Sequence, residues 1–455
     1  MKFGLSRWTW AFLALLAAAL TVRLVLVLTH ANMWGVDGGA YFLSVNAVLG
    51  DEPTGAGFPR PPLAPGWLLV PFTALWGNDT GYKIWSAVAA TLPIGAIYLL
   101  ARNFLTPPQS LFAAGFAAID FLHGEMFVTG ALPLIGFSLI AVAVWASWRL
   151  ADPREFRWRY VGILAAAIPL TVYVNQTSAG LLLILLPIFL LSVNAFGGGR
   201  ISLPIRLLAT PWTLLPITLA CLVGGAIAFT ALPWYLDIAP GSAILHYPGP
   251  WMYLVTHLES SWLQLLMAVP LGLWVARYGG DNRLRAMGVL IVVLGLLVVW
   301  RSTDETVINI FYRSRYILAM FVYPAIAWVV FKYWWQPIRR YSPALLAGLL
   351  VGAVAIFGTG YLWAVDRQAE YSDMVTVQTA AALRVLRNEA PGQGVVTNSF
   401  TLSLWVSGLN KVVTPHVWTW EPPRAYTETD KDVRCVIGWV AGCDWEGAAE
   451  ELGVA

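Results

Sequence analysis

The chain has 455 residues, of which 58% are hydrophobic and only 12% are charged, and its formal net charge is +3. Soluble proteins carry roughly 25% charged residues, so a soluble enzyme, a disordered scaffold and a nucleic-acid-binding protein are excluded. The composition predicts a polytopic membrane protein. Its 24 Trp and 17 Tyr residues suit two membrane interfaces, where amphipathic rings are enriched.

Apolar runs predict about 11 transmembrane helices, because a helix needs roughly 20 apolar residues to cross the hydrocarbon core. The first run has no small-residue cleavage site, so it is predicted to be a retained span and not a signal peptide. The run 67–76 is too short to span, and we expect it to lie along the interface or to re-enter the membrane. The predicted spans are 8–29, 82–101, 109–123, 127–148, 160–174, 177–196, 213–236, 258–276, 286–300, 316–335 and 343–363.

The distribution of charge predicts the orientation. With the N-terminus inside, the inner loops hold 15 Lys or Arg residues and three acids, whereas the outer loops and their borders hold five basic residues and ten acids. Basic residues are enriched in cytoplasmic loops. We therefore expect a multi-pass protein of the cell inner or plasma membrane, with a cytoplasmic N-terminus and an extracytoplasmic C-terminus.

Two regions are predicted. Residues 1–363 form the membrane domain, with a large extracytoplasmic loop at 30–81. Residues 364–455 form a small extracytoplasmic C-terminal domain of α/β type, with short strands expected at 394–397 and 435–438. Cys435 and Cys443 lie eight residues apart in this tail, and the sequence leaves open whether they form a disulfide.

The most informative stretch is Met-Trp-Gly-Val-Asp-Gly-Gly-Ala-Tyr at 33–41, which places Asp37 and Tyr41 just outside the first span. Its glycines allow backbone and ligand to approach closely. An acid there without an adjacent Lys or Arg is a candidate general base, or a ligand of a divalent cation such as Mg²⁺ or Mn²⁺. The alternative is that Asp37 caps a helix that begins near Gly38.

Three polar residues, Asp120, His123 and Glu125, surround the outer turn predicted between the spans 109–123 and 127–148. Acids at membrane depth are candidate functional residues. Glu125 lies closest to the predicted turn, so we expect it to face a water-filled cavity. Asp120 is either buried and paired or is itself the second acid of the site.

Arg313 and Arg315 precede the span 316–335 on the predicted outer side, against the positive-inside trend, and Tyr316 begins the span. A phosphate or pyrophosphate leaving group is one partner that would justify these arginines. The alternative is a structural ion pair with the nearby acids Asp304 and Glu305.

Three further residues complete the predicted site. Arg60 is the only basic residue of the proline-rich segment 57–67 and is a candidate phosphate ligand, although a lone interfacial arginine can simply extend to the headgroups. Lys83 enters the second span from the same side. His246 lies in the aromatic-rich segment 245–251, which is suited to a sugar or a lipid headgroup.

The order of these features resembles the membrane-embedded glycosyltransferases of the C-type fold (GT-C), in particular the bacterial dolichyl-phosphate-mannose-protein mannosyltransferase and aminoarabinose transferase branch. By motif the resemblance covers residues 33–67 and 313–324, where Arg315-Tyr316 followed by Pro324 is similar to the Arg-Tyr-x-Leu-x-x-x-x-Pro pattern of that branch. It implies an all-α polytopic membrane protein with a GT-C-like fold.

The resemblance also implies an activity: inverting transfer of a hexosyl or pentosyl group from a polyprenyl-phosphate donor to a cell-envelope glycan, lipid or protein at the outer face of the membrane. Asp37 would match the first-loop acid that activates the acceptor or binds a metal, and Arg315 a residue near the carrier phosphate. Two departures stand out. Gly38 follows where many relatives have a second acid, and 129–133 is Thr-Gly-Ala-Leu-Pro where relatives often have Thr-Asp/Glu-Pro-Leu.

Two other functional classes remain. A transporter or flippase of lipid-linked sugars would more often show related halves and functional groups near the bilayer midplane. A non-catalytic membrane assembly subunit would use its tail as the functional part. The clustering of charge at one face favours the enzyme, whose partners would be donor, acceptor and membrane lipids.

Overall fold

A computed structural model of the chain describes residues 6–30, 38–49, 63–129, 131–151, 158–197, 244–246, 267–301 and 306–372. Several predictions of the sequence fall outside these residues: the roles of Asp37 and Arg60, the alternative partners Asp304 and Glu305, and the span 213–236. So do the cysteines Cys435 and Cys443 and the tail beyond Ser372.

The described residues are almost entirely helical, which confirms the predicted all-α membrane class. The elements are α1 (Arg7–Thr29), α2 (Gly38–Val48), α3 (Leu63–Trp76), α4 (Asn78–Ala101), α5 (Pro107–Ala118), α6 (Phe121–Thr129), α7 (Leu132–Leu150), α8 (Trp158–Val174), α9 (Gln176–Phe196), β1 (Ile244–His246), α13 (Asn282–Arg301), β2 (Thr306–Ile308), α14 (Asn309–Val329), the π-helix η1 (Val330–Trp334), α15 (Trp335–Tyr341) and α16 (Pro343–Ser372). Residues 267–278 form a further helix.

Six of the described helices are long and apolar enough to cross a membrane, and α5 with α6 would make a seventh crossing if this bent pair is one span. The protein is therefore a multi-pass membrane protein. The full count of about 11 spans stays a prediction, because part of the chain lies outside the described residues.

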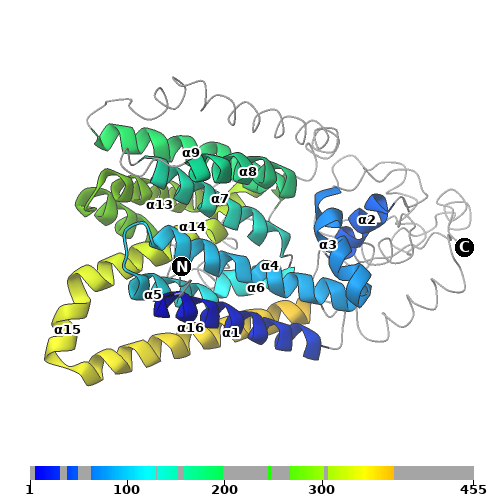
Figure 1. Cartoon of the computed structure of the whole chain (residues 1–455), viewed down its shortest axis with the longest axis horizontal. Coiled ribbons are helices and arrows are strands. Elements are labelled where there is room, and N and C mark those ends of the chain that lie inside the picture. Colours follow the sequence, from blue (N-terminus) through cyan, green and yellow to red (C-terminus); the bar gives the residue numbers. More distant parts are fainter. Residues whose placement is uncertain are drawn as a thin grey trace, which may run out of the picture.

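The helices form a bundle in which α7 packs against α4 and α8, and α13 packs against α9 and α14 (Figure 1). Helix α14 runs through its centre: residues 317–322 are all fully buried. A helix that is apolar on every side belongs in the interior of a bundle. Ser314, Arg315 and Tyr316, which precede this stretch, are buried as well, so they lie inside the protein and do not face the lipid.

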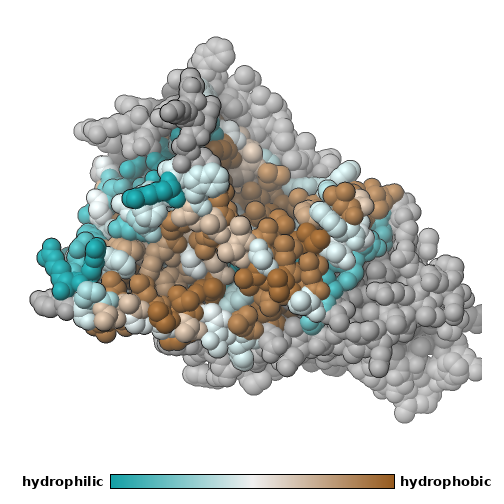
Figure 2. Space-filling view, turned by 60° about the horizontal axis from the view of Figure 1, so that its bottom comes forward, coloured by the Kyte–Doolittle hydropathy of each residue, from teal (hydrophilic) through white to brown (hydrophobic). Residues whose placement is uncertain are grey.

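The outside of the bundle is apolar. Figure 2 shows a broad hydrophobic surface on the face that carries α1 and α16, with hydrophilic residues gathered toward its ends. Exposed side chains of these two helices include Trp10, Val22 and Val25 of α1 and Leu349, Val354 and Ile356 of α16. Apolar side chains are favourable here because hydrocarbon chains, not water, surround a membrane span.

The short apolar run 67–76 lies in α3, a helix of 14 residues that packs on α2 and α4. Helices α2 and α3 lie together at one end of the bundle, and α15 lies at the opposite end (Figure 1). Gly66 allows the tight pairing of α2 and α3, because a Cβ there would lie 2.2 Å from the Ser44 carbonyl oxygen. Trp67 and Trp76 are exposed, which suits an interfacial helix.

The connection after α5 differs from the prediction. The sequence placed an outer turn near Glu125, but α6 continues to Thr129 and α7 begins at Leu132. The bend lies instead at Ile119–Asp120, where the axes of α5 and the segment Leu122–Val128 differ by 52°. Glu125 therefore lies within a helix, one turn before its end.

Two short strands were not predicted. β1 and β2 pair antiparallel, with His246 opposite Thr306 and Ile244 opposite Ile308. β2 leads directly into α14. The pairing therefore brings the segment around His246 to the start of the central helix, although some 60 residues separate the two strands in the sequence.

Gly288 of α13 lies where this helix crosses the helix 267–278. A Cβ at Gly288 would lie 2.4 Å from the Ala276 nitrogen and 2.6 Å from the Gly272 carbonyl oxygen. We expect Gly288→Ala to reduce the free energy of unfolding by about 1–3 kcal/mol, because the two backbones must separate. The melting temperature of the detergent-solubilised protein would measure this loss.

Gly352→Ala is the matched control for that substitution, because a Cβ at Gly352 of α16 meets nothing within 4 Å. Its melting temperature should equal that of the wild type or exceed it slightly, since alanine favours the helix. A Gly288→Ala variant as stable as the control would contradict the close helix crossing.

Candidate functional site

Arg315 and Tyr316 lie at the second turn of α14. The sequence placed them before the span, but α14 begins at Asn309, so both are already inside a helix and only 3% and 1% exposed. The Arg315 guanidinium donates a hydrogen bond to the Tyr316 hydroxyl and lies 4.5 Å from the centre of its ring. Phe137 of α7 stacks on the Tyr316 ring at 6.4 Å between centroids. The arginine is thus a buried cation with a fixed direction.

Lys83 is held at the start of α4. Its ammonium group lies 3.0 Å from the Asp79 carboxylate and donates a 3.0 Å hydrogen bond to the carbonyl oxygen of His30, which ends α1. Lys83 is only 5% exposed. A lysine with two such partners joins α1 to α4, so a role in binding a phosphate would require it to exchange or share the Asp79 contact.

Tyr41 lies one turn inside α2 and is 7% exposed. Its ring packs on two aromatic residues of α4, at 6.0 Å from the Tyr82 ring and 5.6 Å from the Trp85 ring. Helix α2 begins at Gly38, directly after Asp37 in the sequence, which agrees with the helix start assumed in the alternative interpretation of Asp37 as a cap. The aromatic contacts thus hold the start of α2 against the end of α4 that carries Lys83.

Three predicted residues are described by their backbone alone. Glu125 lies in α6, Arg313 in α14 and His246 in β1. The backbone places Arg313 at the start of the helix that carries Arg315, and the β1–β2 pairing brings His246 to the same end of α14. Six of the predicted residues therefore fall into two groups: Tyr41 and Lys83 near the start of α4, and Arg315, Tyr316, Arg313 and His246 near the start of α14. Glu125 lies apart from both in the sequence, in α6.

A third group of polar residues lies in the core, and we call Arg23, Asp120, His123, Tyr323 and Tyr361 the core polar cluster. They come from α1, the α5–α6 bend, α14 and α16, and each is 3% exposed or less. Asp120 accepts hydrogen bonds from the Tyr323 hydroxyl and from the backbone N–H of His123, the latter at 3.1 Å. The Arg23 guanidinium lies 5.5 Å from the centre of the Tyr361 ring.

Asp120 and His123 were candidate residues from the sequence, whereas the other three residues of the cluster were not. Arg23 could have been identified from the sequence, because an arginine inside a predicted span is rare and indicates a polar partner within the protein. Tyr323 and Tyr361 could not, since tyrosine is common in membrane helices.

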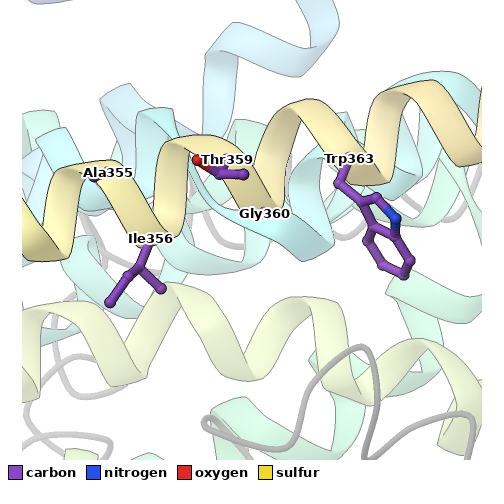
Figure 3. Close-up of a pocket in the computed structure, with 5 residues that line it drawn as sticks. All are labelled: Ala355, Ile356, Thr359, Gly360 and Trp363. Carbon is purple, nitrogen blue, oxygen red and sulfur yellow. The ribbon is translucent and has the colours of Figure 1, made fainter.

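An open groove of about 490 Å³ runs beside α16 and is lined by Ala355, Ile356, Thr359, Gly360 and Trp363 (Figure 3). Ile356 and Trp363 project from the same side of the helix. None of the residues predicted from the sequence lines this groove. Its lining is mainly apolar, so it suits a hydrocarbon chain better than a sugar.

Residues 60–226 match the family described as dolichyl-phosphate-mannose-protein mannosyltransferase. Among solved structures, the chain is similar to ArnT from Cupriavidus metallidurans bound to undecaprenyl phosphate, with 15% identity, a TM-score of 0.52, and coverage of 89% of this chain and 76% of ArnT. It is also similar to the Archaeoglobus fulgidus oligosaccharyltransferase tethered with an acceptor peptide, with 14% identity, a TM-score of 0.60, and coverage of 98% and 68%. The chain has the C-type glycosyltransferase fold.

At 14–15% identity these structures show the fold of the chain and nothing finer. No curated protein sequence matches the chain closely enough to add to them. The resemblance first suggested by the motifs at 33–67 and 313–324 is confirmed at the level of the C-type fold.

Asp37, the predicted ligand of a divalent cation, lies outside the described residues. In the described ranges, no group of three or more His, Cys, Asp or Glu side chains could hold a metal ion. One structure of the A. fulgidus oligosaccharyltransferase is a complex with Zn and sulfate, at 12% identity, a TM-score of 0.51, and coverage of 87% of this chain and 62% of that one. A divalent cation at Asp37 stays a prediction, and the reaction below uses only the side chains of this protein.

Proposed function

We propose that this C-type membrane protein is a glycosyltransferase, which moves a sugar from a polyprenyl-phosphate donor to a cell-envelope glycan, lipid or protein at the outer face of the membrane. The match of residues 60–226 to a lipid-phosphate mannosyltransferase family supports the reaction class. ArnT has the same fold and binds undecaprenyl phosphate, which supports a polyprenyl-phosphate sugar as the donor.

One observation carries the proposal most strongly: the burial of Arg315 at the start of the central helix. Burying a charge is costly, so an arginine is retained inside an apolar bundle where it has structural partners or a ligand to bind. Guanidinium is the group best suited to a phosphate, because it remains charged and donates paired hydrogen bonds in one plane. The Tyr316 hydroxyl and ring already fix its direction.

The proposed reaction is a single inverting displacement. The acceptor hydroxyl oxygen attacks the anomeric carbon of the sugar, and the bond from that carbon to the phosphate oxygen breaks. The leaving group departs as polyprenyl phosphate, whose added negative charge Arg315 stabilises. The hydroxyl proton passes to Asp37 as general base. Inversion needs one acid near the acceptor and no second carboxylate as nucleophile.

The remaining residues have supporting roles in this proposal. Arg313, Lys83 and Arg60 are further cations for the donor phosphate, and Tyr41 and His246 are contacts for the sugar or acceptor. Glu125 is the candidate second acid. The apolar groove beside α16 offers a surface of suitable chemistry for the isoprenoid chain, which already lies in the bilayer.

Mass spectrometry of envelope lipids and glycans, with and without the protein, would test the function and reveal the acceptor. The proposal predicts that cells lacking the protein lose one glycan modification and accumulate a polyprenyl-phosphate sugar on the outer leaflet. Accumulation confined to the inner leaflet would indicate a flippase. If the Asp37→Asn variant and the Arg315→Ala variant each restored the lost glycan modification in full, the protein would be a non-catalytic subunit.

A further inference from the structure

The apolar pair α5 and α6 is bent by 52° between its two helices, and the bend is stabilised by polar contacts. Ile119 leaves the helical conformation, with φ −116° and ψ 22°, so carbonyl groups at the end of α5 lose their normal helical partners. Arg23 of α1 donates a 3.1 Å hydrogen bond to the Ala118 carbonyl oxygen. The Asp120 carboxylate accepts from the His123 backbone N–H at 3.1 Å, which caps the start of α6.

Asp120 also joins this break to the central helix. Its Oδ1 atom accepts a hydrogen bond from the Tyr323 hydroxyl, across 203 residues of sequence. Tyr323 lies seven residues after Tyr316, which is two helical turns along the same face of α14. A helix held at Tyr323 therefore has its rotation fixed at Tyr316 and, beside it, at Arg315.

Both carboxylate oxygens of Asp120 are engaged, and the side chain has no exposed surface. His123 Nδ1 lies 3.4 Å from the same oxygen that caps α6. A general base must reach the proton that it removes, directly or through one water. This environment does not suit a catalytic acid or base, and it does suit a residue that holds two helices in register.

We propose that Asp120 is a positioning residue: through Tyr323 it sets the rotation of α14, and so directs Arg315 and Tyr316 toward the donor phosphate. The inference rests on the proposed function and assigns Asp120 a role different from that of Glu125. When a binding group is displaced by about 1 Å, much of its contribution to the free energy of ligand binding is lost. One hydrogen bond at the centre of the bundle can therefore affect donor affinity without touching the donor.

The test uses two nearly isosteric variants of the full-length protein in nanodiscs, Tyr323→Phe and Asp120→Asn. Each is measured for binding of undecaprenyl phosphate, and for KM and kcat with a polyprenyl-phosphate sugar that the wild type uses. Tyr323→Phe removes only the hydroxyl and should raise both the Kd and the donor KM about tenfold, because α14 loses the contact that sets its rotation and Arg315 is displaced from the donor phosphate. Its kcat should change less than about threefold.

Asp120→Asn should behave more mildly, since the amide can still accept from the His123 N–H and donate to the Tyr323 oxygen. The double variant Asp120→Ala with Tyr323→Phe should be no worse than Asp120→Ala alone, because the two residues act through one contact. Thr171→Val is the matched control: it removes a fully buried hydroxyl from α8, which bonds only its own helix at 2.7 Å. Its donor KM should stay at the wild-type value.

Two results would overturn the positioning role. One is a Tyr323→Phe variant with wild-type donor KM and Kd. The other is an Asp120→Asn variant that is folded and binds donor normally but has lost more than 100-fold in kcat, which would make Asp120 catalytic. A wild-type protein that releases no polyprenyl phosphate from any donor would instead contradict the proposed function on which this role rests.

Discussion

Sugar transfer is expected to fall by about 100- to 10,000-fold when Asp37 is replaced by asparagine, the range that general-base catalysis contributes. Asparagine keeps the shape of aspartate and is an equally good helix cap, but it cannot accept the proton of the acceptor. The loss should therefore appear in kcat, with little change in the donor KM or in the melting temperature. Steady-state kinetics with purified protein and a polyprenyl-phosphate sugar would measure it.

Asp51→Asn is the control for this variant, because Asp51 lies in the same predicted outer loop and has no assigned role. Its activity should equal that of the wild type. If Asp37→Asn also retained full kcat, the acid would serve only as a helix cap, and the general base would have to be sought among other residues of the loop.

The second large effect is expected at Arg315. Arg315→Ala should weaken binding of undecaprenyl phosphate about 10- to 100-fold, because hydrogen bonds to charged groups contribute about 1.5–3 kcal/mol. Arg315→Lys should restore part of this loss, since lysine keeps the charge but not the planar pair of donors. Titration of the nanodisc-bound protein with undecaprenyl phosphate would give both dissociation constants.

Arg340→Ala is the matched control, because it also removes one arginine, but from an exposed position in α15. It should leave the dissociation constant for undecaprenyl phosphate unchanged. The assignment of Arg315 would be wrong if its alanine variant, still folded, bound the carrier as tightly as Arg340→Ala. Arg315 would then be a structural cation of the core that stabilises the start of α14.

Much of the helical framework could be predicted from the sequence, because the length of an apolar run decides whether it spans. The observed α1, α8 and α9 agree with the predicted spans to within two residues at each end. The start of α14 could not be predicted in this way. Residues 309–315 are polar enough to resemble a loop, yet they form the first turns of a helix whose residues 317–322 are fully buried in the bundle.

The bend between α5 and α6 shows a different limit. An apolar run gives no indication of where a helix breaks inside the membrane, and a break is tolerated only where the protein supplies partners for its polar groups. Those partners are Arg23 and Tyr323, which lie 97 and 203 residues from Asp120 in the sequence. Such contacts depend on how the helices pack, so spacing along the chain cannot predict them.

For the candidate site, the sequence identified individual residues but not their grouping. Arg315 and Tyr316 are neighbours in the chain, so their contact could be expected. The approach of His246 to the start of α14 could not, because β1 and β2 are three residues each, too short to show an alternating pattern.

In the proposed reaction the protein breaks the bond between a sugar and a polyprenyl phosphate. This step can be followed by incubating purified wild-type protein, in liposomes, with undecaprenyl phosphates carrying labelled mannose, glucose or aminoarabinose, together with an envelope extract as acceptor. We predict that one donor is converted to free undecaprenyl phosphate and a labelled product, and that Asp37→Asn prevents the conversion. Donors that all remain intact, or that only change leaflet, would contradict the account.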